Sequence, residues 1–144
     1  MKLQTSTRLA LCSVLEFVAR PGRQVSAGEI AQKYGVSTHH LSKVLRELGR
    51  AGIVESARGV GGGYRFAGNA KRLTLMDVIG LFEDIGGGDL PHGSTEVERA
   101  LATVLSEIDE NARATFGSIT LDTMLKLIEF QGRIEDKNAA EPQR

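Results

Sequence analysis

The chain has 144 residues, of which 18 are Lys or Arg and 18 are Asp or Glu, so its formal net charge is zero. Its one cysteine, Cys12, excludes a disulfide framework within the chain and a metal site built from several of its thiolates. The length suits one domain, or one domain with an arm. The sequence has no secretory segment and no apolar run of about 18 residues, so we expect a cytoplasmic protein that makes no contact with a membrane.

The zero net charge conceals a division between the two halves of the chain. Residues 1–72 carry twelve Lys and Arg against four Asp and Glu, a net charge of +8. Residues 73–144 carry six against fourteen, a net charge of −8. A basic half attracts a polyanion and an acidic half repels it, which indicates nucleic acid as the partner of the first half.

Two helices are predicted at the start of the basic half. Apolar residues at helical spacing predict the first over residues 7–20, and a Pro-Gly pair ends it. Ser26 and Glu29 have the spacing of a capping box, so a second, short helix should begin there. Its C-terminal end is expected near Gly35.

A third helix follows a tight turn, in which Ser37 or Thr38 can act as the cap. Two short helices joined by such a turn form the helix-turn-helix pattern. The inward face of the third helix is aliphatic and consists of Leu41, Val44, Leu45 and Leu48. His40 lies between this face and the polar one, and we expect it to be structural.

The polar face of the third helix carries a stripe of basic side chains. The stripe consists of His39, Lys43, Arg46 and Arg50, with Ser42 at its border. An ordinary solvated helix face would also be polar. On the second helix of a helix-turn-helix, within a basic half, the stripe favours contact with the DNA major groove.

The glycine-rich stretch ARGVGGGYRF, residues 57–66, raises the question of a phosphate-binding loop. A Walker loop needs a Gly-Lys pair before Ser or Thr, and a dinucleotide fingerprint needs a glycine where Tyr64 stands and a helix after it. Both enzyme patterns are therefore excluded. Two short strands flank the stretch, which predicts a hairpin with Arg58 at its base and Arg65 just beyond. Such a hairpin after a helix-turn-helix is the wing of a winged helix. Arg58 is expected in the minor groove, and Arg65 is expected to contact DNA as well.

The acidic half predicts two further helices. Thr95 and Glu98 form a capping box, and Val97, Leu101, Val104 and Ile108 then recur at spacings of four, three and four. This heptad-like seam can pack on its own domain or on a second copy of the chain. A second helix is expected after Gly117. The polar residues 135–144 show no pattern, so we expect a disordered tail.

The segment THHLSKVLRELGRAGIVESARGVGGGYRFAGN, with the N-terminal helix and LTLMDVIGLFE, resembles the Rrf2 family of bacterial winged-helix regulators. The resemblance implies a mainly α fold. It divides the chain into a winged helix-turn-helix domain over residues 1–84, a loop over 85–94, dimerisation helices over 95–134 and the tail over 135–144. It also implies a homodimeric regulator, more often a repressor, that binds a palindromic operator in double-stranded DNA.

By the same resemblance, His39, Ser42 and Lys43 occupy base-reading positions in the major groove, and Arg58 occupies the wing position in the minor groove. Many members hold an iron–sulfur cluster with three cysteines in the loop after the DVI helix. The corresponding residues here, 84–98, contain no cysteine, and His92 alone cannot replace three thiolates. We therefore expect a member without a cofactor or a metal.

Other interpretations stay open at this point. Cys12 can be an inert, half-buried hydrophobe, or a redox-active thiol with Arg8 as its positive neighbour. The winged helix can serve as a protein-interaction scaffold, although its basic stripe has no apolar anchors. No catalytic pattern is visible, so we expect no enzyme. The effector, the operator sequence and the direction of regulation are left undetermined.

Overall fold

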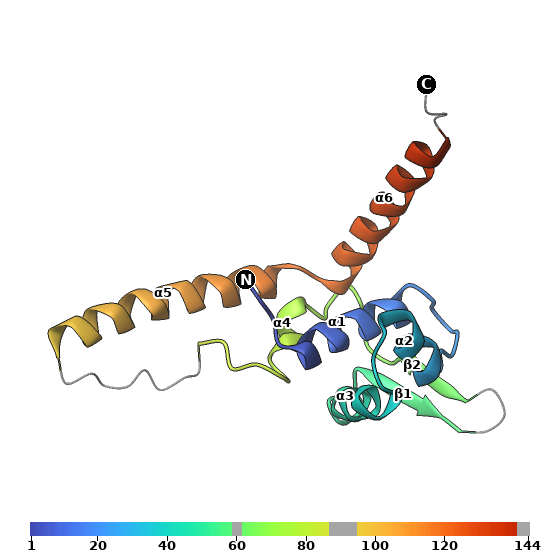
Figure 1. Ribbon diagram of the computed structural model, residues 1–144, viewed down its shortest axis with the longest axis horizontal. Coiled ribbons are helices and arrows are strands. Elements are labelled where there is room, and N and C mark those ends of the chain that lie inside the picture. The colour runs from blue at the N-terminus through green and yellow to red at the C-terminus, as the bar shows by residue number, and fades with distance from the viewer. Residues whose placement is uncertain (59–61, 87–94, 141–144) are drawn as a thin grey trace.

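The computed structural model describes residues 1–58, 62–86 and 95–140. Three helices and a two-stranded hairpin form the first part, and three more helices follow (Figure 1). The elements are α1 (Thr5–Val18), α2 (Ala27–Tyr34), α3 (Thr38–Arg50), β1 (Val54–Ala57), β2 (Gly63–Phe66), α4 (Leu75–Ile79), α5 (Glu96–Ser118) and α6 (Leu121–Ala140). The order confirms the predicted mainly α fold with a winged helix-turn-helix at its start.

One hydrophobic core holds the winged domain together. Helix α1 is central to it, because it packs against α3, α4, α6 and β2. Phe17 of α1 is fully buried and stacks on Tyr64 of β2, with ring centroids 6.4 Å apart. The predicted aliphatic face of α3 is buried in the same core, which turns the opposite face of α3 toward solvent.

The helix-turn-helix is fixed by the local signals that the sequence contains. The Ser26 side chain accepts a hydrogen bond from the Glu29 backbone N–H at 3.1 Å and so caps α2. Gly35 ends α2 with a φ of 64°, a left-handed conformation that favours glycine. Ser37, and not Thr38, caps α3 by accepting from the His40 N–H at 3.1 Å. These contacts set the angle at which α3 leaves the turn.

The hairpin is tied to the segment that precedes α2. Strands β1 and β2 are antiparallel, with Val54 opposite Phe66 and Ala57 opposite Gly63. Val25 and Tyr64 form a further bridge through two backbone hydrogen bonds of 2.8 and 2.9 Å. A Cβ atom at Gly63 would lie 2.7 Å from the Val25 carbonyl oxygen, so this close approach requires glycine.

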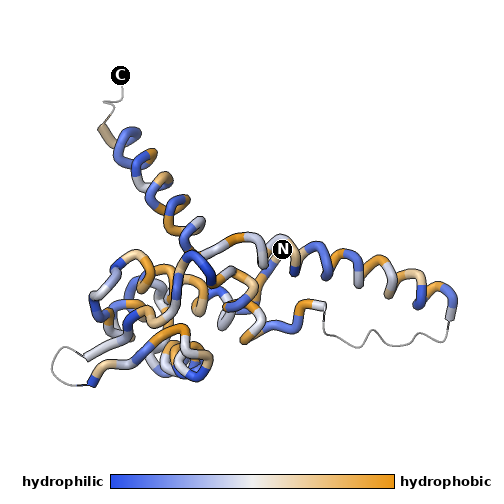
Figure 2. Tube along the Cα trace, turned by 180° about the vertical axis from the view of Figure 1, so that it is seen from behind, coloured by the Kyte–Doolittle hydropathy of each residue, from blue (hydrophilic) through white to orange (hydrophobic). Residues whose placement is uncertain are grey.

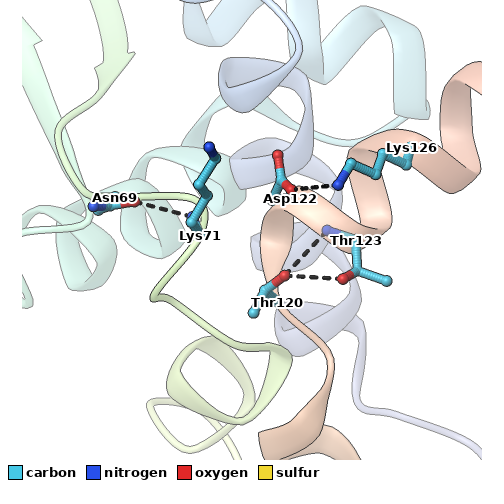
Figure 3. Close-up of polar contacts among 6 residues, drawn as sticks. All are labelled: Asn69, Lys71, Thr120, Asp122, Thr123 and Lys126. Carbon is cyan, nitrogen blue, oxygen red and sulfur yellow. Dashed lines mark hydrogen bonds and ion pairs between the residues drawn. The ribbon is translucent and has the colours of Figure 1, made fainter.

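The first turn of helix α6 lies beside the loop after the hairpin (Figure 3), and backbone hydrogen bonds anchor it there. Leu121 is fully buried, and its N–H donates to the Leu73 carbonyl at 2.9 Å. The Thr120 hydroxyl oxygen accepts from the Thr123 N–H at 3.1 Å, which caps the helix start. Met124 and Leu125 also pack against the core, and the later turns of α6 extend away from the domain (Figure 1).

The polar residues 135–140 continue α6 and do not form the expected disordered tail. The helix that precedes them supplies the nucleus, so each further residue adds a backbone hydrogen bond without a nucleation cost. The segment also ends in two alanines, the best helix formers. The last four residues of the expected tail, 141–144, lie outside the described residues.

Helix α5 extends away from the winged domain as a single arm (Figure 1). Its 23 residues include none that is buried in this chain. The capping box at its start is present as predicted, with Thr95 accepting from the Glu98 N–H and Glu98 accepting from the Thr95 N–H. Hydrophobic positions recur along the arm at helical spacing (Figure 2).

Candidate nucleic-acid interface

The outward face of α3 presents the predicted basic stripe to solvent. His39, Lys43, Arg46 and Arg50 are all exposed, and Ser42 is half-buried at the border of the stripe. Because α3 buries four aliphatic residues on its other side, the helix cannot turn this stripe inward. The stripe can therefore donate hydrogen bonds and carry positive charge into a groove of a polyanion.

An open hollow of about 710 Å³ separates α3 from the hairpin. Its lining residues are Ser42, Leu45, Arg46, Gly49, Val54, Glu55, Ser56 and Tyr64. Two of the predicted DNA contacts, Ser42 and Arg46, thus face the same hollow as the stem of the wing. The structure brings the recognition face and the wing stem together on one side of the domain.

Two of the predicted DNA-contacting arginines are paired with carboxylates. Arg50 lies 2.8 Å from the Glu47 carboxylate one helical turn away, and Arg65 lies 2.9 Å from the Glu55 carboxylate on the neighbouring strand. All four side chains are about half exposed or more. Such surface pairs contribute only about 0–1 kcal/mol, so a phosphate can replace either carboxylate.

Arg58 follows β1 directly and is exposed. Residues 59–61 of the predicted wing tip lie outside the described residues. Arg58 therefore lies at the end of a strand whose partner, β2, is bridged to Val25 beside α2. This places a cation directly after β1, and its role in the minor groove stays a prediction.

His40 is a structural contact, as expected from its position between the two faces of α3. Its Nε2 atom lies 3.2 Å from the Ser6 hydroxyl of α1. The pair borders a smaller hollow of about 400 Å³ that His39, Lys43 and Phe82 also line. The contact with Ser6 connects α3 to α1, and nothing in the spacing of the sequence indicates it.

Cys12 lies half-buried on α1, where the surroundings do not favour a reactive thiol. Burial raises the pKa of the Cys12 thiol and outweighs the opposing charge of Arg8. A raised pKa lowers the share of thiolate at neutral pH, which favours the inert interpretation of Cys12 over the redox one.

The residues present do not fit an iron–sulfur cluster. Clusters are held mainly by several Cys thiolates, and the one cysteine of this chain lies on α1, beside Glu16 and Tyr34. Among the described residues no three His, Cys, Asp or Glu side chains gather as a metal site. Most of the loop at the family's cluster position, residues 87–94 with His92, lies outside the described residues.

The seam on α5 is exposed in the single chain. Its exposed fractions are 78% for Val97, 58% for Leu101, 53% for Val104 and 55% for Ile108. The seam therefore does not pack on its own domain, which was one of the two interpretations of its heptad-like spacing. Leu105, exposed at 44%, widens the apolar surface of the same arm.

Comparisons with known proteins agree with this geometry. A family model described as Rrf2, an iron-dependent transcriptional regulator, matches residues 3–127. The chain is 54% identical over 136 residues to BadM of Rhodopseudomonas palustris, which is named an HTH-type transcriptional regulator; the match covers 92% of this chain and 86% of BadM.

Solved structures give the same result. CymR, the global cysteine regulator of B. subtilis, superposes with a TM-score of 0.72 at 28% identity, over 88% of this chain and 98% of CymR. IscR of T. potens superposes with a TM-score of 0.66 at 26% identity, over 100% of this chain and 94% of IscR. Within the described part of the chain, no helix is long and apolar enough to cross a bilayer.

Proposed function

Because the chain belongs to the Rrf2 family of transcriptional regulators, we propose that it acts as a homodimeric repressor in the cytoplasm, bound to a palindromic operator. In this proposal α3 enters the major groove and the wing arginine enters the minor groove. The observation that carries it is the exposed basic stripe of α3, which faces the same side of the domain as the hairpin.

The stripe supports sequence-specific contact because its members differ in chemistry. Lys43 and Arg46 can donate to the acceptor atoms of guanine, and Ser42 can donate or accept at either pair type. Arg50 at the end of α3 and Arg65 on β2 are placed to contact phosphates, which fix the register of the protein on the duplex. The family's non-enzymatic role agrees with the exclusion of a phosphate-binding loop.

The exposed seam on α5 supports the dimer. A helix of 23 residues spans about 35 Å, and the four seam residues of α5 leave an apolar face exposed in the single chain. A second copy offers the same seam, so a two-fold pairing covers both faces at once. Two-fold symmetry would set the two α3 helices about 34–36 Å apart, one turn of DNA.

Selection of bound duplexes from a random DNA pool tests the proposal directly. We expect a palindrome with half-sites about one turn apart, and an affinity that falls steeply as salt rises because Lys and Arg contacts release counterions. A reporter gene behind the recovered operator should be repressed when the protein is present.

Lys43→Ala should weaken binding to the recovered operator, whereas Lys137→Ala on α6, which also removes an exposed lysine, should not. Failure to enrich any sequence, or binding that ignores salt, would refute the proposal and favour the protein-interaction scaffold.

A further inference from the structure

A third pocket lies on a part of the winged domain that the proposed DNA interface does not use. It has a volume of about 500 Å³ and opens between α1, α2 and the first half of α6. Its lining residues are Cys12, Leu15, Glu16, Ala19, Arg20, Lys33, Tyr34 and Ile128. None of them lines the hollow between α3 and the hairpin. The volume lies within the range of about 300–1,000 Å³ that is usual for small-molecule sites.

The polar end of this pocket is built around the Glu16 carboxylate. The Tyr34 hydroxyl donates to Glu16 Oε1 at 2.6 Å, and Lys33 Nζ lies 2.5 Å from the same oxygen. Arg20 lies 3.5 Å from Oε2. Burial alone would raise the pKa of Glu16, but the hydrogen bonds from Lys33 and Tyr34 and the charges of Lys33 and Arg20 lower it, so the carboxylate stays ionised.

This end of the pocket has an excess of positive charge. Two cations, Arg20 and Lys33, line it, and Glu16 supplies the one negative charge among its lining residues. Glu16 already accepts hydrogen bonds from Tyr34 and Lys33, whereas the planar guanidinium of Arg20 makes only a single 3.5 Å contact among the described ion pairs. An arginine with free donors is suited to a carboxylate, which it can bind through two parallel hydrogen bonds.

The rest of the pocket wall is apolar. Leu15 and Ala19 come from α1 and Ile128 from α6. Cys12 adds a further apolar surface, because burial raises the pKa of its thiol and keeps it uncharged. The pocket thus combines a hydrocarbon-lined body with one cationic end, and a molecule with the matching shape is an organic acid with a short hydrocarbon chain.

We propose that this pocket binds a small organic acid, with its carboxylate on Arg20 and Lys33 and its hydrocarbon body against Leu15, Ala19 and Ile128. We further infer that this ligand is the effector of DNA binding, a role that rests on the proposed function. Lys33 and Tyr34 belong to α2, the first helix of the helix-turn-helix, and Ile128 belongs to α6, which leads away from the domain. A ligand that contacts both α2 and α6 favours one relative position of the two helices. Because α2 is part of the helix-turn-helix, this also changes the position of the DNA-binding elements.

The sole cysteine provides the test, because a thiol reagent can mark only this pocket. We would measure the reaction of native protein with 5,5′-dithiobis(2-nitrobenzoate) in the presence of hexanoate, and of 1-hexanol and hexylamine as neutral and cationic controls. Hexanoate at ten times its Kd should slow the reaction about tenfold, since the fraction of protein without ligand equals 1/(1 + [L]/Kd). The alcohol and the amine should protect far less, because they lack the charge that Arg20 and Lys33 recognise.

A pair of variants separates the pocket from general charge effects. Arg20→Gln should abolish protection by hexanoate, whereas Arg23→Gln, an exposed arginine three residues further on and outside the pocket, should keep it. Equal protection by all three compounds, no protection by hexanoate up to 10 mM (about the weakest affinity worth pursuing), or a cysteine that reacts only after unfolding would overturn the binding site.

The effector role is tested separately, on the selected operator. Hexanoate should change the operator Kd of the unmodified protein by a factor of about 5–150, and the operator should change the hexanoate Kd by the same factor. Binding of hexanoate without any such change would overturn the effector role. Failure of the proposed function would be distinguishable from failure of the effector role, because the protein would then not bind DNA even when no hexanoate is present.

Discussion

Arg65 of β2 lies opposite Glu55 of β1, and its Nε and one Nη atom both donate to the same carboxylate oxygen, at 3.0 and 2.9 Å. One of the cations predicted to contact DNA therefore has a carboxylate partner across the hairpin. The pair is about half exposed, so its net contribution is small and a phosphate can compete for the guanidinium. We therefore expect Glu55 to lower the affinity of the wing stem for every sequence alike.

Glu55→Gln should strengthen binding to all duplexes. The change frees Arg65 for a phosphate and removes a negative charge beside the hollow, and each phosphate contact adds about one to the salt slope. Titrations of a random duplex at several salt concentrations measure both effects. Glu107→Gln on α5 removes the same charge far from the hairpin and should leave the slope unchanged. A weaker affinity in Glu55→Gln would mean that Arg65 serves only the hairpin.

Lys43→Ala and Arg50→Ala should affect DNA binding differently: the first should change base preference, and the second should change overall affinity. Lys43 lies in the middle of the exposed face of α3, so its loss should relax preference at one base position at a cost of about 1–3 kcal/mol. Arg50 lies at the end of α3 and already pairs with Glu47, so its loss should weaken all sequences alike and by less. Competition between the operator and its single-base variants measures the two patterns. Interchanged patterns would reverse the two roles.

Arg58→Ala should reduce affinity for operators with A·T-rich flanks more than for those with G·C-rich flanks. A·T tracts narrow the minor groove and deepen its negative potential, which an inserted arginine reads as shape. Because Arg58 is exposed, the thermal stability of the domain should not change. An equal loss on both flanks would make Arg58 a simple phosphate contact.

Val104→Asp should convert the proposed dimer into a monomer without unfolding the winged domain. The side chain is 53% exposed in the single chain, so the charge would be buried only in a seam shared by two copies. Sedimentation equilibrium reports the mass, and circular dichroism reports the fold. Thr103→Asp, on the neighbouring exposed position of α5, is the matched control and should remain dimeric. A dimer that tolerates Val104→Asp would place the seam elsewhere.

Gly63→Ala and Gly117→Ala should shift stability in opposite directions. At Gly63 the new Cβ would meet the Val25 carbonyl oxygen at 2.7 Å, and such overpacking costs about 1–3 kcal/mol. At Gly117, near the end of α5, nothing lies within 4 Å, so alanine should be neutral or stabilise the helix by up to about 1 kcal/mol. Thermal melts of the two variants measure the contrast. A Gly63→Ala protein with unchanged stability would show that the backbone around Val25 can give way.

The sequence was sufficient for features that depend on residues a few positions apart. The caps at Ser26, Ser37 and Thr95 follow from such local spacing, and all three are present. Thr74 and Asp77 form another capping box, at α4, which the same spacing in TLMD could have revealed.

Features that depend on three-dimensional packing were not accessible from the sequence. The register that opposes Glu55 to Arg65 depends on the conformation of the turn between the strands, and the meeting of α1, α2 and α6 near Glu16 joins segments far apart along the chain. Residues 135–140 were misjudged for a related reason: polar composition suggested disorder, whereas the preceding helix decides their conformation.

The exposed seam of α5 has a genetic consequence. In the proposed dimer each chain can complete its arm only with another chain, and every chain offers the same seam. A copy whose α3 can no longer read DNA would still pair with intact copies and leave them with a single functional half-site. Alleles that damage the recognition helix should therefore be dominant over the wild type in cells that carry both, whereas alleles that damage the seam should be recessive.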